Sequence, residues 1–493
     1  MRVYEELALI YALTRRLGTE IDLREICRMI IEEAENILNP ANTVLLLADE
    51  EKGVLRTVFA SGSHMAEALA FTHPLESGIL GQICTNRRSV IVSDMEREVQ
   101  PIPLPFPAKR LLAVPLVAND TAIGVIFALD KLDGSDFDSR ESKLLSAISS
   151  VAALAIKNAQ LYSNIKNLFD GFINASVTAV EARDPTTSGH STRVALLTVE
   201  LAKRVDASDL PVFRNMSFSS EQLLEIRYAG LLHDFGKIGV SESVLVKETK
   251  LSRDHMERIM DRFSYIRERK TREALEKKLE ILLNEGKDAY LEAIGAIDAE
   301  LVLAAARLDE DMELLRVAND PRVLRTELPE LARLKEIAEL FYSDLHGENR
   351  PYLTPFEFKN LNVLKGSLND AERREIESHV THSYNFLNRI PWTKNLSRIA
   401  DVVYAHHEKL DGSGYPRRLA ADDIPLQAKM MTVADIYDAL TASDRPYKKA
   451  VSVEKALFIL EMEAKEGKLE PHLVQIFRDA QVYRVAEELS GRR

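Results

Sequence analysis

The stretch GLLHDFGKIG, residues 230–239, sets a histidine beside an aspartate at the point where a helical pattern ends. Apolar residues recur with helical spacing over 223–232, so His233 and Asp234 are expected near the C-terminus of an amphipathic helix. Neighbouring residues on a helix point about 100° apart. Both side chains can therefore bind metal only if they embrace one ion at the helix end or serve two ions.

A second pair, His406-His407, lies in VVYAHHEKLDGSGYP, residues 402–416. Imidazole and carboxylate ligands together suit Zn²⁺, Mn²⁺ or Fe, and one carboxylate can bridge two ions. Two adjacent pairs with further histidines and aspartates indicate a binuclear metal site. The other candidates in motifs of this kind are His190, His379, His382 and Asp435.

The composition is that of an ordinary globular protein with more than one domain. The chain has 493 residues, of which 46% are apolar and 29% charged, and this exceeds the size at which a single core keeps growing. The net charge of −13 argues against a nucleic-acid polymer as a partner, because phosphate backbones attract basic surfaces. Cys27 and Cys84 provide no disulfide framework, so we expect a cytoplasmic location.

No membrane span is expected from the sequence. The longest apolar runs, such as 151–156, fall far short of the roughly 18–20 residues that cross a bilayer. The first residues, MRVYEELALIYALTRRL, place acidic side chains before the apolar positions and show no cleavage-site pattern. We expect them to form an amphipathic helix and not a signal peptide.

Residues 1–160 alternate between helical and strand patterns, which predicts an α+β domain. A helix is expected near 23–38, and Asn119-Asp120 is expected to form a hairpin turn. One sheet with helices on one face accounts for this pattern. The predicted strands are 43–48, 55–60, 89–93, 111–117 and 122–129.

This region resembles a GAF domain, the small-molecule sensor module, over residues 20–162. The matching strings are SGILGQICTNRRSVIVSD (77–94), LLAVPLVANDTAIGVIFALDKLDGSDF (111–137) and SAISSVAALAIKNAQLY (146–162). LDKLDGSDF is similar to a segment of cyclic-nucleotide-binding GAF domains, although Asp130 replaces an Asn. The resemblance leaves two roles open, which are binding of an unidentified small molecule, and support and dimerisation without a ligand.

A long helix is predicted from 141 to 183, where there is no Pro and a single Gly. Apolar residues recur there at threes and fours, which suits a paired seam between two helices. We therefore expect a homodimer through the GAF-like domain and a connecting helix at 161–180. The second half of the helix can also open the core of the next domain, and both interpretations can hold.

Residues 250–365 carry none of these motifs and interrupt the region that does. They are dense in Glu, Lys, Arg, Leu and Ala, so we expect a mostly helical insertion. A lid, a dimer contact and a solvated helical hairpin all remain open as roles. The insertion separates two groups of expected metal ligands.

Residues 172–483 resemble an HD-GYP domain, the bacterial cyclic di-GMP phosphodiesterase branch of the all-α HD superfamily. The supporting strings are EARDPTTSGHSTRV, LLHDFGKIGV, HHEKLDGSGYP and DIYDALTASDRPYK, in the family's order. Gly414-Tyr415-Pro416 is the tripeptide that names the family, and it is intact. The resemblance implies a metal-dependent phosphodiesterase domain over 181–493.

The resemblance also implies which residues bind metal, with Asp234 bridging two ions. The ligands of the first ion would be His190, His233, Asp234 and Asp435. The second ion would be completed by His379, His406 and His407, whereas His382 is expected to be structural.

Members of the family with three ions carry a Glu two residues after the Asp of an Arg-Asp motif. This chain has Thr186 at that position, and threonine is a poor ligand. We therefore expect two divalent ions per chain, Fe or Mn. Two such ions lower the pKa of a bound water and offset charge on a phosphate.

The same resemblance implies residues that contact the substrate. Lys237 matches a phosphate-contacting lysine, and Arg445 and Lys448 match a phosphate clamp, for which Arg donors are well suited. Tyr415 is expected to contact the base or the sugar, or to bind regulators.

The expected catalytic residues are Asp184, Asp234 and Lys237. Asp184 and Glu408 can either orient ligands or move protons, and the sequence does not decide between these roles.

These expectations predict hydrolysis of cyclic di-GMP to pGpG, regulated by the GAF-like domain, with further cleavage to GMP left open. Two alternatives remain. The substrate can be another cyclic dinucleotide, such as cyclic GMP-AMP, or the domain can be a slow or inactive module that binds cyclic dinucleotides and other signalling proteins.

Overall fold

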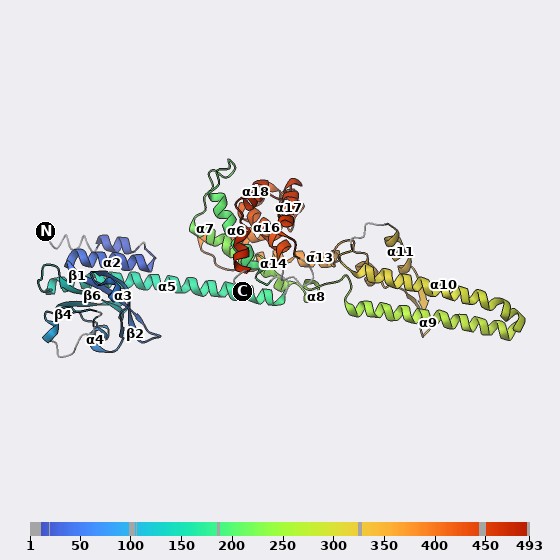
Figure 1. Cartoon of the computed structure of the whole chain (residues 1–493), viewed down its shortest axis with the longest axis horizontal. Coiled ribbons are helices and arrows are strands. Elements are labelled where there is room, and N and C mark those ends of the chain that lie inside the picture. Colours follow the sequence, from blue (N-terminus) through green and yellow to red (C-terminus); the bar gives the residue numbers. More distant parts are fainter. Residues whose placement is uncertain are drawn as a thin grey trace. The chain divides into compact units, whose positions relative to one another are not determined.

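The computed structural model describes residues 11–18, 20–97, 104, 106–184, 188–323, 328–442 and 450–490. The chain divides into two compact units, Met1–Gly171 and Phe172–Arg493. Figure 1 shows a sheet with helices in the first unit and a helical second unit. The expected fold classes, α+β followed by all-α, are confirmed.

The sheet of the first unit has six antiparallel strands in the order β3-β2-β1-β6-β5-β4. All five predicted strands are present, and the three-residue β3 is the addition. It is too short to produce a recognisable alternation. The strands are β1 (Pro40–Asp49), β2 (Val54–Gly62), β3 (Thr72–Pro74), β4 (Val90–Val92), β5 (Leu111–Ala118) and β6 (Thr121–Lys131).

The turn between β5 and β6 is formed by Asn119 and Asp120, as predicted. Both residues have positive φ, 50° and 60°, and a two-residue hairpin turn of this kind matches the twist of the strands that it joins. Asn and Asp tolerate this conformation better than other non-glycine residues. The turn therefore sets the register of the two most apolar strands after β1.

Helices cover both faces of the sheet, so the expectation of helices on one face was wrong (Figure 1). On β1, Leu45 and Leu47 pack with α2 and α5, whereas Val44 and Leu46 pack with α3 and α4. A strand buried on both faces is a nearly continuous apolar run, which period-two alternation does not reveal. The helices are α2 (Leu23–Leu38), α3 (Met65–Leu69), α4 (Gly78–Asn86) and α5 (Ser139–Arg183).

In the segment LDKLDGSDF, which is similar to cyclic-nucleotide-binding GAF domains, Asp130 and Lys131 both bind other residues of the same unit. The Asp130 carboxylate accepts hydrogen bonds from the backbone N–H groups of Lys109 (3.1 and 3.2 Å) and Arg110 (2.8 Å). The Lys131 ammonium forms an ion pair with Glu141 at 2.6 Å. These contacts hold the end of β6 against the loop that precedes β5 and against the start of α5.

Helix α5 is the long helix that the sequence predicts. Among the described residues it is also the helix that is long and apolar enough, by length and composition, to cross a membrane, and 39% of its most apolar window is buried in the protein. One side of it packs on the sheet through Leu145, Ile148 and Ile156. Its other side is exposed over several turns.

The second unit is built mainly from helices. Those outside the insertion are α6 (His190–Asp206), α7 (Ser220–Leu232), α8 (Glu242–Leu245), α13 (Asp370–Glu377), α14 (His379–Leu387), α15 (Ile399–Tyr404), α16 (Leu426–Thr441), α17 (Val453–Lys465), α18 (Pro471–Asp479) and α19 (Arg484–Ser490), with the 3₁₀ turns η3 (Phe235–Gly239), η4 (Lys394–Leu396) and η5 (Ala421–Asp423).

Helices α6 and α7 pack closely because Gly230 has no side chain. A Cβ built on Gly230 would lie 2.6 Å from the Cα of Ala195 on α6. Helix α7 begins with a capping box, in which Ser219 and Gln222 each accept a hydrogen bond from the other's backbone N–H, and His233 is its C-cap residue. The cap and the glycine together set where the His233-Asp234 pair lies.

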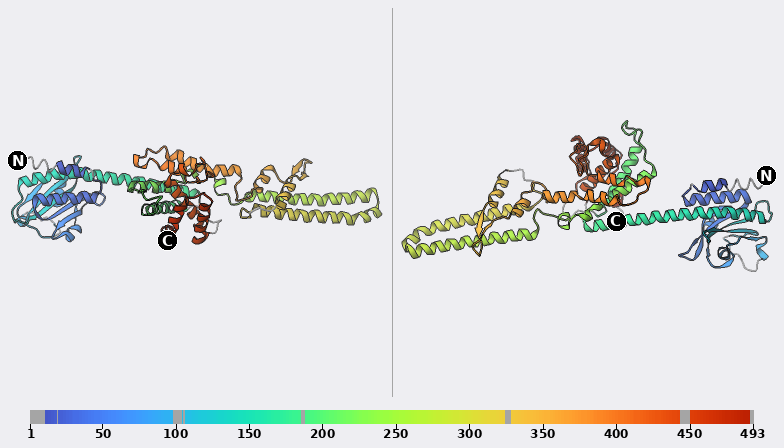
Figure 2. Two further views of the ribbon diagram at one scale, coloured as in Figure 1. Left: turned by 90° about the horizontal axis from the view of Figure 1, so that it is seen from above. Right: turned by 180° about the vertical axis from the view of Figure 1, so that it is seen from behind.

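The insertion is mostly helical, as expected, and has an apolar core. Its long helices α9 (Arg253–Asn284) and α10 (Lys287–Asn319) lie side by side in both views of Figure 2. Its other elements are α11 (Leu328–Ala338), α12 (Pro355–Leu361) and the hairpin of β7 (Phe341–Ser343) and β8 (Asn349–Pro351). The core includes Phe263, Leu315 and Tyr352, so the insertion is more than a solvated hairpin.

Replacing Gly230 by Ala should lower the stability of the second unit by about 1–3 kcal/mol, because the new Cβ overpacks against Ala195. Gly295, in the middle of α10, has nothing within 4 Å of a built Cβ and is the matched control. Gly295→Ala should raise stability by about 0.5–1 kcal/mol through helix propensity. Thermal unfolding followed by circular dichroism checks both, and equal effects of the two substitutions would contradict the packing argument.

Candidate metal centre

The structure brings all seven expected metal ligands into three overlapping groups. Within each group the ligand atoms lie within 4.8 Å of one another. The groups are His190, His233 and Asp435; His233, Asp234 and His406; and His379, His406 and His407. Two groups share His233 and two share His406, so the three form one continuous cluster.

Three of these imidazoles are held in the same way. The Nδ1 atoms of His233, His379 and His406 each contact the backbone carbonyl three residues earlier, at 2.7, 2.6 and 2.6 Å. A carbonyl can only accept, so each Nδ1 donates a proton and each Nε2 carries a lone pair. This arrangement fixes the tautomer and the ring orientation of a metal-binding histidine.

The Nε2 atoms of the same three histidines are buried and have no hydrogen-bond partner. Burying an unpartnered polar atom costs free energy, and buried polar groups are normally satisfied. Three such lone pairs beside carboxylates are the donor set that a divalent transition metal prefers. The residues present therefore fit a metal centre.

The Asp234 carboxylate lies between the histidines of the two expected ion sites. Its Oδ1 is 3.3 Å from Nε2 of His379, and its Oδ2 is 3.5 Å from Nε2 of His233 and 3.8 Å from Nε2 of His190. Each oxygen thus faces a different histidine group. This is the position that a bridging ligand requires.

Asp435 supplies the second carboxylate of the cluster. Its Oδ1 is 3.1 Å from Nε2 of His190, and its Oδ2 is 3.8 Å from Nδ1 of His407. It comes from α16, whereas His190 opens α6 and His407 follows α15. Helix packing alone brings these groups together.

Burial keeps several of these imidazoles neutral. It lowers the pKa of His407 to about 3, although Asp435 opposes the shift, and it lowers the pKa of His406 well below its ordinary value. The pKa of His379 is also lowered, again mainly by burial. Neutral imidazoles offer lone pairs to a metal without first losing a proton.

Neighbouring charges outweigh burial at His190 and Asp234. Burial by itself lowers the pKa of His190, but its contacts with Asp435 and Asp438 outweigh burial and raise that pKa to about 9. Burial by itself raises the pKa of Asp234, but the positive charge of Lys237 outweighs burial and lowers that pKa well below its ordinary value. The carboxylates are therefore ionised.

Lys237 is packed against the bridging carboxylate. Its Nζ lies 2.9 Å from Oδ2 of Asp234 and 2.9 Å from Oδ2 of Asp184, and all three side chains are nearly buried. The lysine thus holds Asp234 in place and neutralises part of the negative charge. Contact between Lys237 and a substrate phosphate remains a prediction.

A clamp behind the His233-Asp234 pair was not predicted from the sequence. The hydroxyl of Ser383 donates to the carbonyl of His233 at 2.8 Å and accepts from the N–H of Gly236 at 2.7 Å. A Cβ on Gly236 would lie 1.9 Å from the carbonyl oxygen of His379. Gly236 was the available signal, since it lies three residues after His233 in the opening motif.

The loop that contains Tyr415 is held by Glu408. The two carboxylate oxygens of this buried residue accept hydrogen bonds from the backbone N–H groups of Arg417 (2.7 Å) and Leu419 (2.9 Å). The Tyr415 ring lies 4.8 Å from the His407 ring, measured between centroids. Glu408 therefore holds this loop, a role that differs from the two left open for it, which were orienting ligands and moving protons.

Of the other residues predicted from the sequence, the structure describes His382 but not Thr186, Arg445 or Lys448. His382 is exposed and its ring lies against Gly239, 2.8 Å from a built Cβ, and it joins none of the ligand groups. Thr186, Arg445 and Lys448 lie outside the described residues. Their expected roles remain predictions.

Two residues that were not singled out from the sequence also contact the cluster. Oδ2 of Asp438 lies 2.7 Å from Nδ1 of His190. Arg193 donates to both oxygens of the same carboxylate, from Nε at 2.6 Å and from Nη2 at 3.0 Å. Asp438 lies three residues after Asp435, in the motif DIYD.

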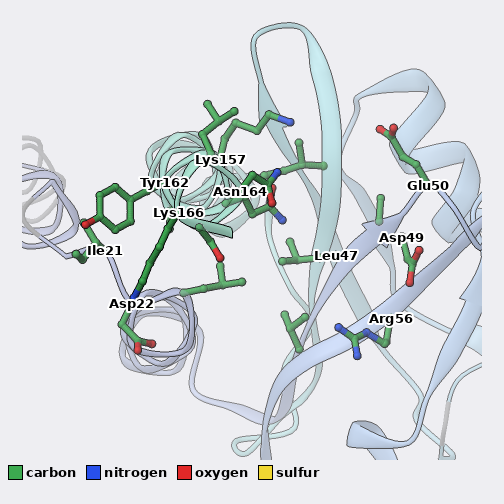
Figure 3. A pocket seen from close by; sticks show the side chains of 18 of the residues that line it. Ile21, Asp22, Leu47, Asp49, Glu50, Arg56, Lys157, Tyr162, Asn164 and Lys166 are labelled. Atoms are coloured by element: carbon green, nitrogen blue, oxygen red, sulfur yellow. The ribbon is translucent and has the colours of Figure 1, made fainter. Parts of the chain in front are cut away.

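The first unit has a separate groove of about 760 Å³ beside α5. Figure 3 shows Lys157 and Asn164 of α5 on one side of it and Arg56 of β2 on the other. Asp22 and Asp49 add negative charge to the lining. Charges of both signs line this groove, so its lining does not select one class of ligand.

Comparison with known proteins identifies both units. A GAF-domain model matches residues 20–157, and HD-domain models match residues 187–314 and 352–473. The chain carries a GAF domain and an HD domain. The resemblance to a GAF domain followed by an HD-GYP domain is thereby confirmed.

Curated relatives match about a fifth to a quarter of this chain. A 3'3'-cGAMP-specific phosphodiesterase from Vibrio cholerae is 45% identical over 96 residues, which are 20% of this chain and 20% of the relative. A cyclic di-GMP phosphodiesterase from Pseudomonas aeruginosa is 37% identical over 112 residues, 23% of this chain and 26% of the relative. The chain thus spans between a fifth and a quarter of the length of these relatives.

Among solved structures, a GAF domain/HD domain protein from Geobacter sulfurreducens is similar over 31% of this chain and 98% of its own, with 18% identity and a TM-score of 0.27. This similarity is too low to support an argument about function.

Replacing His407 by Ala should reduce the bound metal, because it removes a nitrogen from the His379–His406–His407 group. The loss should approach one ion per chain, measured by elemental analysis of purified protein. His382→Ala is the matched control, since that imidazole lies outside the groups, and it should leave the metal content near that of the unaltered protein. Equal losses in both variants would contradict the assignment of the second group.

Proposed function

We propose that the HD domain is a metal-dependent hydrolase that converts cyclic di-GMP to pGpG in the cytoplasm, with two divalent ions per chain. The observation that carries this proposal is the set of three buried, unpartnered Nε2 atoms around the Asp234 carboxylate. Buried lone pairs of this kind support tight binding of a metal. The relatives named as cyclic dinucleotide phosphodiesterases support the class of substrate.

Two bound ions would supply an activated water and offset negative charge on the phosphate during phosphoryl transfer. Residues of this chain would position the metal ligands and the substrate phosphate for this reaction. Asp234 lies between the two ligand groups, and Lys237, which also pairs with Asp184, holds it in place. Arg445 and Lys448 are proposed to bind the phosphodiester, as a fork of donors does well.

The Tyr415 ring is proposed to contact the base or the sugar. It lies beside His407, at the edge of the ligand cluster, and its backbone N–H donates to the His407 carbonyl at 3.2 Å. A base bound there would meet an aromatic face next to the metal ligands. Such contacts with the base would decide which cyclic dinucleotide is accepted.

A second substrate, 3'3'-cyclic GMP-AMP, is favoured by a specific observation. The match at 45% identity is to a phosphodiesterase named as specific for that compound. Both molecules present the same phosphodiester to the metal groups and differ in one base. The alternative of a slow or inactive binding module predicts binding of either compound without turnover.

Incubation of Mn²⁺- or Fe²⁺-loaded protein with each compound, followed by chromatography of the products, tests the proposal. Cyclic di-GMP should be converted to a linear dinucleotide at a higher rate than 3'3'-cyclic GMP-AMP. Lys237→Ala should lower turnover at least tenfold and mostly retain the metal, because Lys237 contacts Asp184 and Asp234 but lies outside the ligand groups. Binding without product in both metal loadings would support the module and contradict the hydrolase.

The GAF domain is proposed to regulate this activity in a homodimer, through α5. Leu161, Ile165, Leu168 and Phe172 follow one another at alternating intervals of four and three residues and are 48%, 66%, 75% and 55% exposed. This is the spacing of a coiled-coil seam, and such a seam is normally covered by another helix. A second copy of α5 presents the same seam and can cover it.

Replacing Leu168 by Glu should convert the protein to a monomer, because it introduces a charge at the most exposed position of this seam. Sedimentation equilibrium measures the mass. Leu132→Glu is the control, since Leu132 is 69% exposed but lies in the loop after β6, away from the seam. Unaltered protein that sediments as a monomer would contradict the dimer.

A further inference from the structure

His190 is held differently from the other buried histidines of the metal centre. His233, His379 and His406 each donate from Nδ1 to the carbonyl three residues earlier. His190 is the first residue of α6, and its N-cap residue, Gly189, has left-handed backbone with φ 67°. Helix α6 therefore begins at His190, and Nδ1 of His190 contacts Oδ2 of Asp438 on α16 at 2.7 Å.

Asp438 is itself held by two hydrogen bonds from one guanidinium. Arg193 donates from Nε to Oδ1 at 2.6 Å and from Nη2 to Oδ2 at 3.0 Å, which is a bidentate pair. The Asp438 side chain is 3% exposed. Arg193 lies three residues after His190, so the histidine and the clamp of its carboxylate come from one turn of α6.

This chain of contacts points the other ring nitrogen at the metal groups. With Nδ1 donating to Asp438, Nε2 of His190 faces Asp435 at 3.1 Å and Asp234 at 3.8 Å. A charged acceptor on Nδ1 also makes the imidazole a stronger electron donor than a backbone carbonyl does. His190 can alternatively act as a cation between two carboxylates, in which case Asp438 contributes nothing to metal binding.

We propose that Asp438, clamped by Arg193, is a positioning residue that acts through His190 to strengthen binding of the first metal ion. The inference rests on the metal centre of the proposed function but does not require that cyclic di-GMP be the substrate. It assigns to the second aspartate of the DIYD motif a role distinct from that of Asp435, the expected ligand.

The test is the affinity of the metal-free full chain for Mn²⁺, measured by competition with a chelator. Asp438→Asn keeps the size of the side chain and an oxygen that can accept from Nδ1, but removes the charge. It should weaken one of the two Mn²⁺ sites, that of the first ion, about 10- to 100-fold, the usual effect of losing such an outer partner. An affinity equal to that of the unaltered protein would overturn the proposal.

The control separates positioning from general stability. Asp311 is also buried and also accepts from two nitrogens of one guanidinium, Nε and Nη2 of Arg333, each at 2.7 Å, but it lies in the insertion. Asp311→Asn should lower the melting temperature of the metal-free protein and leave Mn²⁺ affinity unchanged. A weakening equal to that of Asp438→Asn would show that the effect is one of folding, and would overturn the proposal.

A second variant tests whether the effect passes through His190. In a His190→Ala background, Asp438→Asn should cause no further loss of Mn²⁺ affinity, because the residue that it positions is gone. A further tenfold loss would mean that Asp438 acts by another route, which contradicts the proposal. Since all readouts are metal affinities, failure to hydrolyse cyclic di-GMP would leave this result unaffected and would count against the proposed function alone.

Discussion

The main physical constraint on the second unit is the burial of imidazole lone pairs beside the Asp234 carboxylate. Unpartnered buried polar atoms and buried charges both oppose folding, so a cluster of them requires compensation. The compensation visible in the chain is partial, consisting of Lys237 on Asp234 and Arg193 on Asp438. The Nε2 atoms of His233, His379 and His406 remain, and the two proposed cations would satisfy them. Metal binding and folding of this unit are therefore expected to be coupled.

The ligand cluster was largely predictable because its members are adjacent in sequence or lie in short motifs. His233-Asp234 and His406-His407 show their pairing directly. The supporting contacts were not predictable in the same way. Ser383 contacts the His233 carbonyl, and Arg193 contacts Asp438. In both pairs the residues lie far apart in the sequence, and serine and arginine are too common to mark such a contact. Only the packing of α6, α14 and α16 reveals these partners.

The fold class was predictable from the periodicity of apolar residues. The main error was the expectation that helices cover one face of the sheet, and it arose because the central strands are buried on both faces. Strands β1 and β6 are apolar on both faces, so their patterns do not show that α3 and α4 cover the second face. The insertion separates two ligand segments, and the fold accommodates it by closing its ends. Lys247, just before the insertion, contacts Glu372, just after it, at 2.7 Å. The entropic cost of bringing the two ends of an insertion together grows only slowly with its length, so a long insertion is tolerated here.

The central claim is that these lone pairs converge on two ions. Crystals of anaerobically purified protein, measured at the Fe and Mn absorption edges and combined with elemental analysis, test it directly. We expect two anomalous peaks per chain, one on each side of Asp234, and two ions by elemental analysis. Three stoichiometric ions, or none with the histidines unchanged in position, would contradict it.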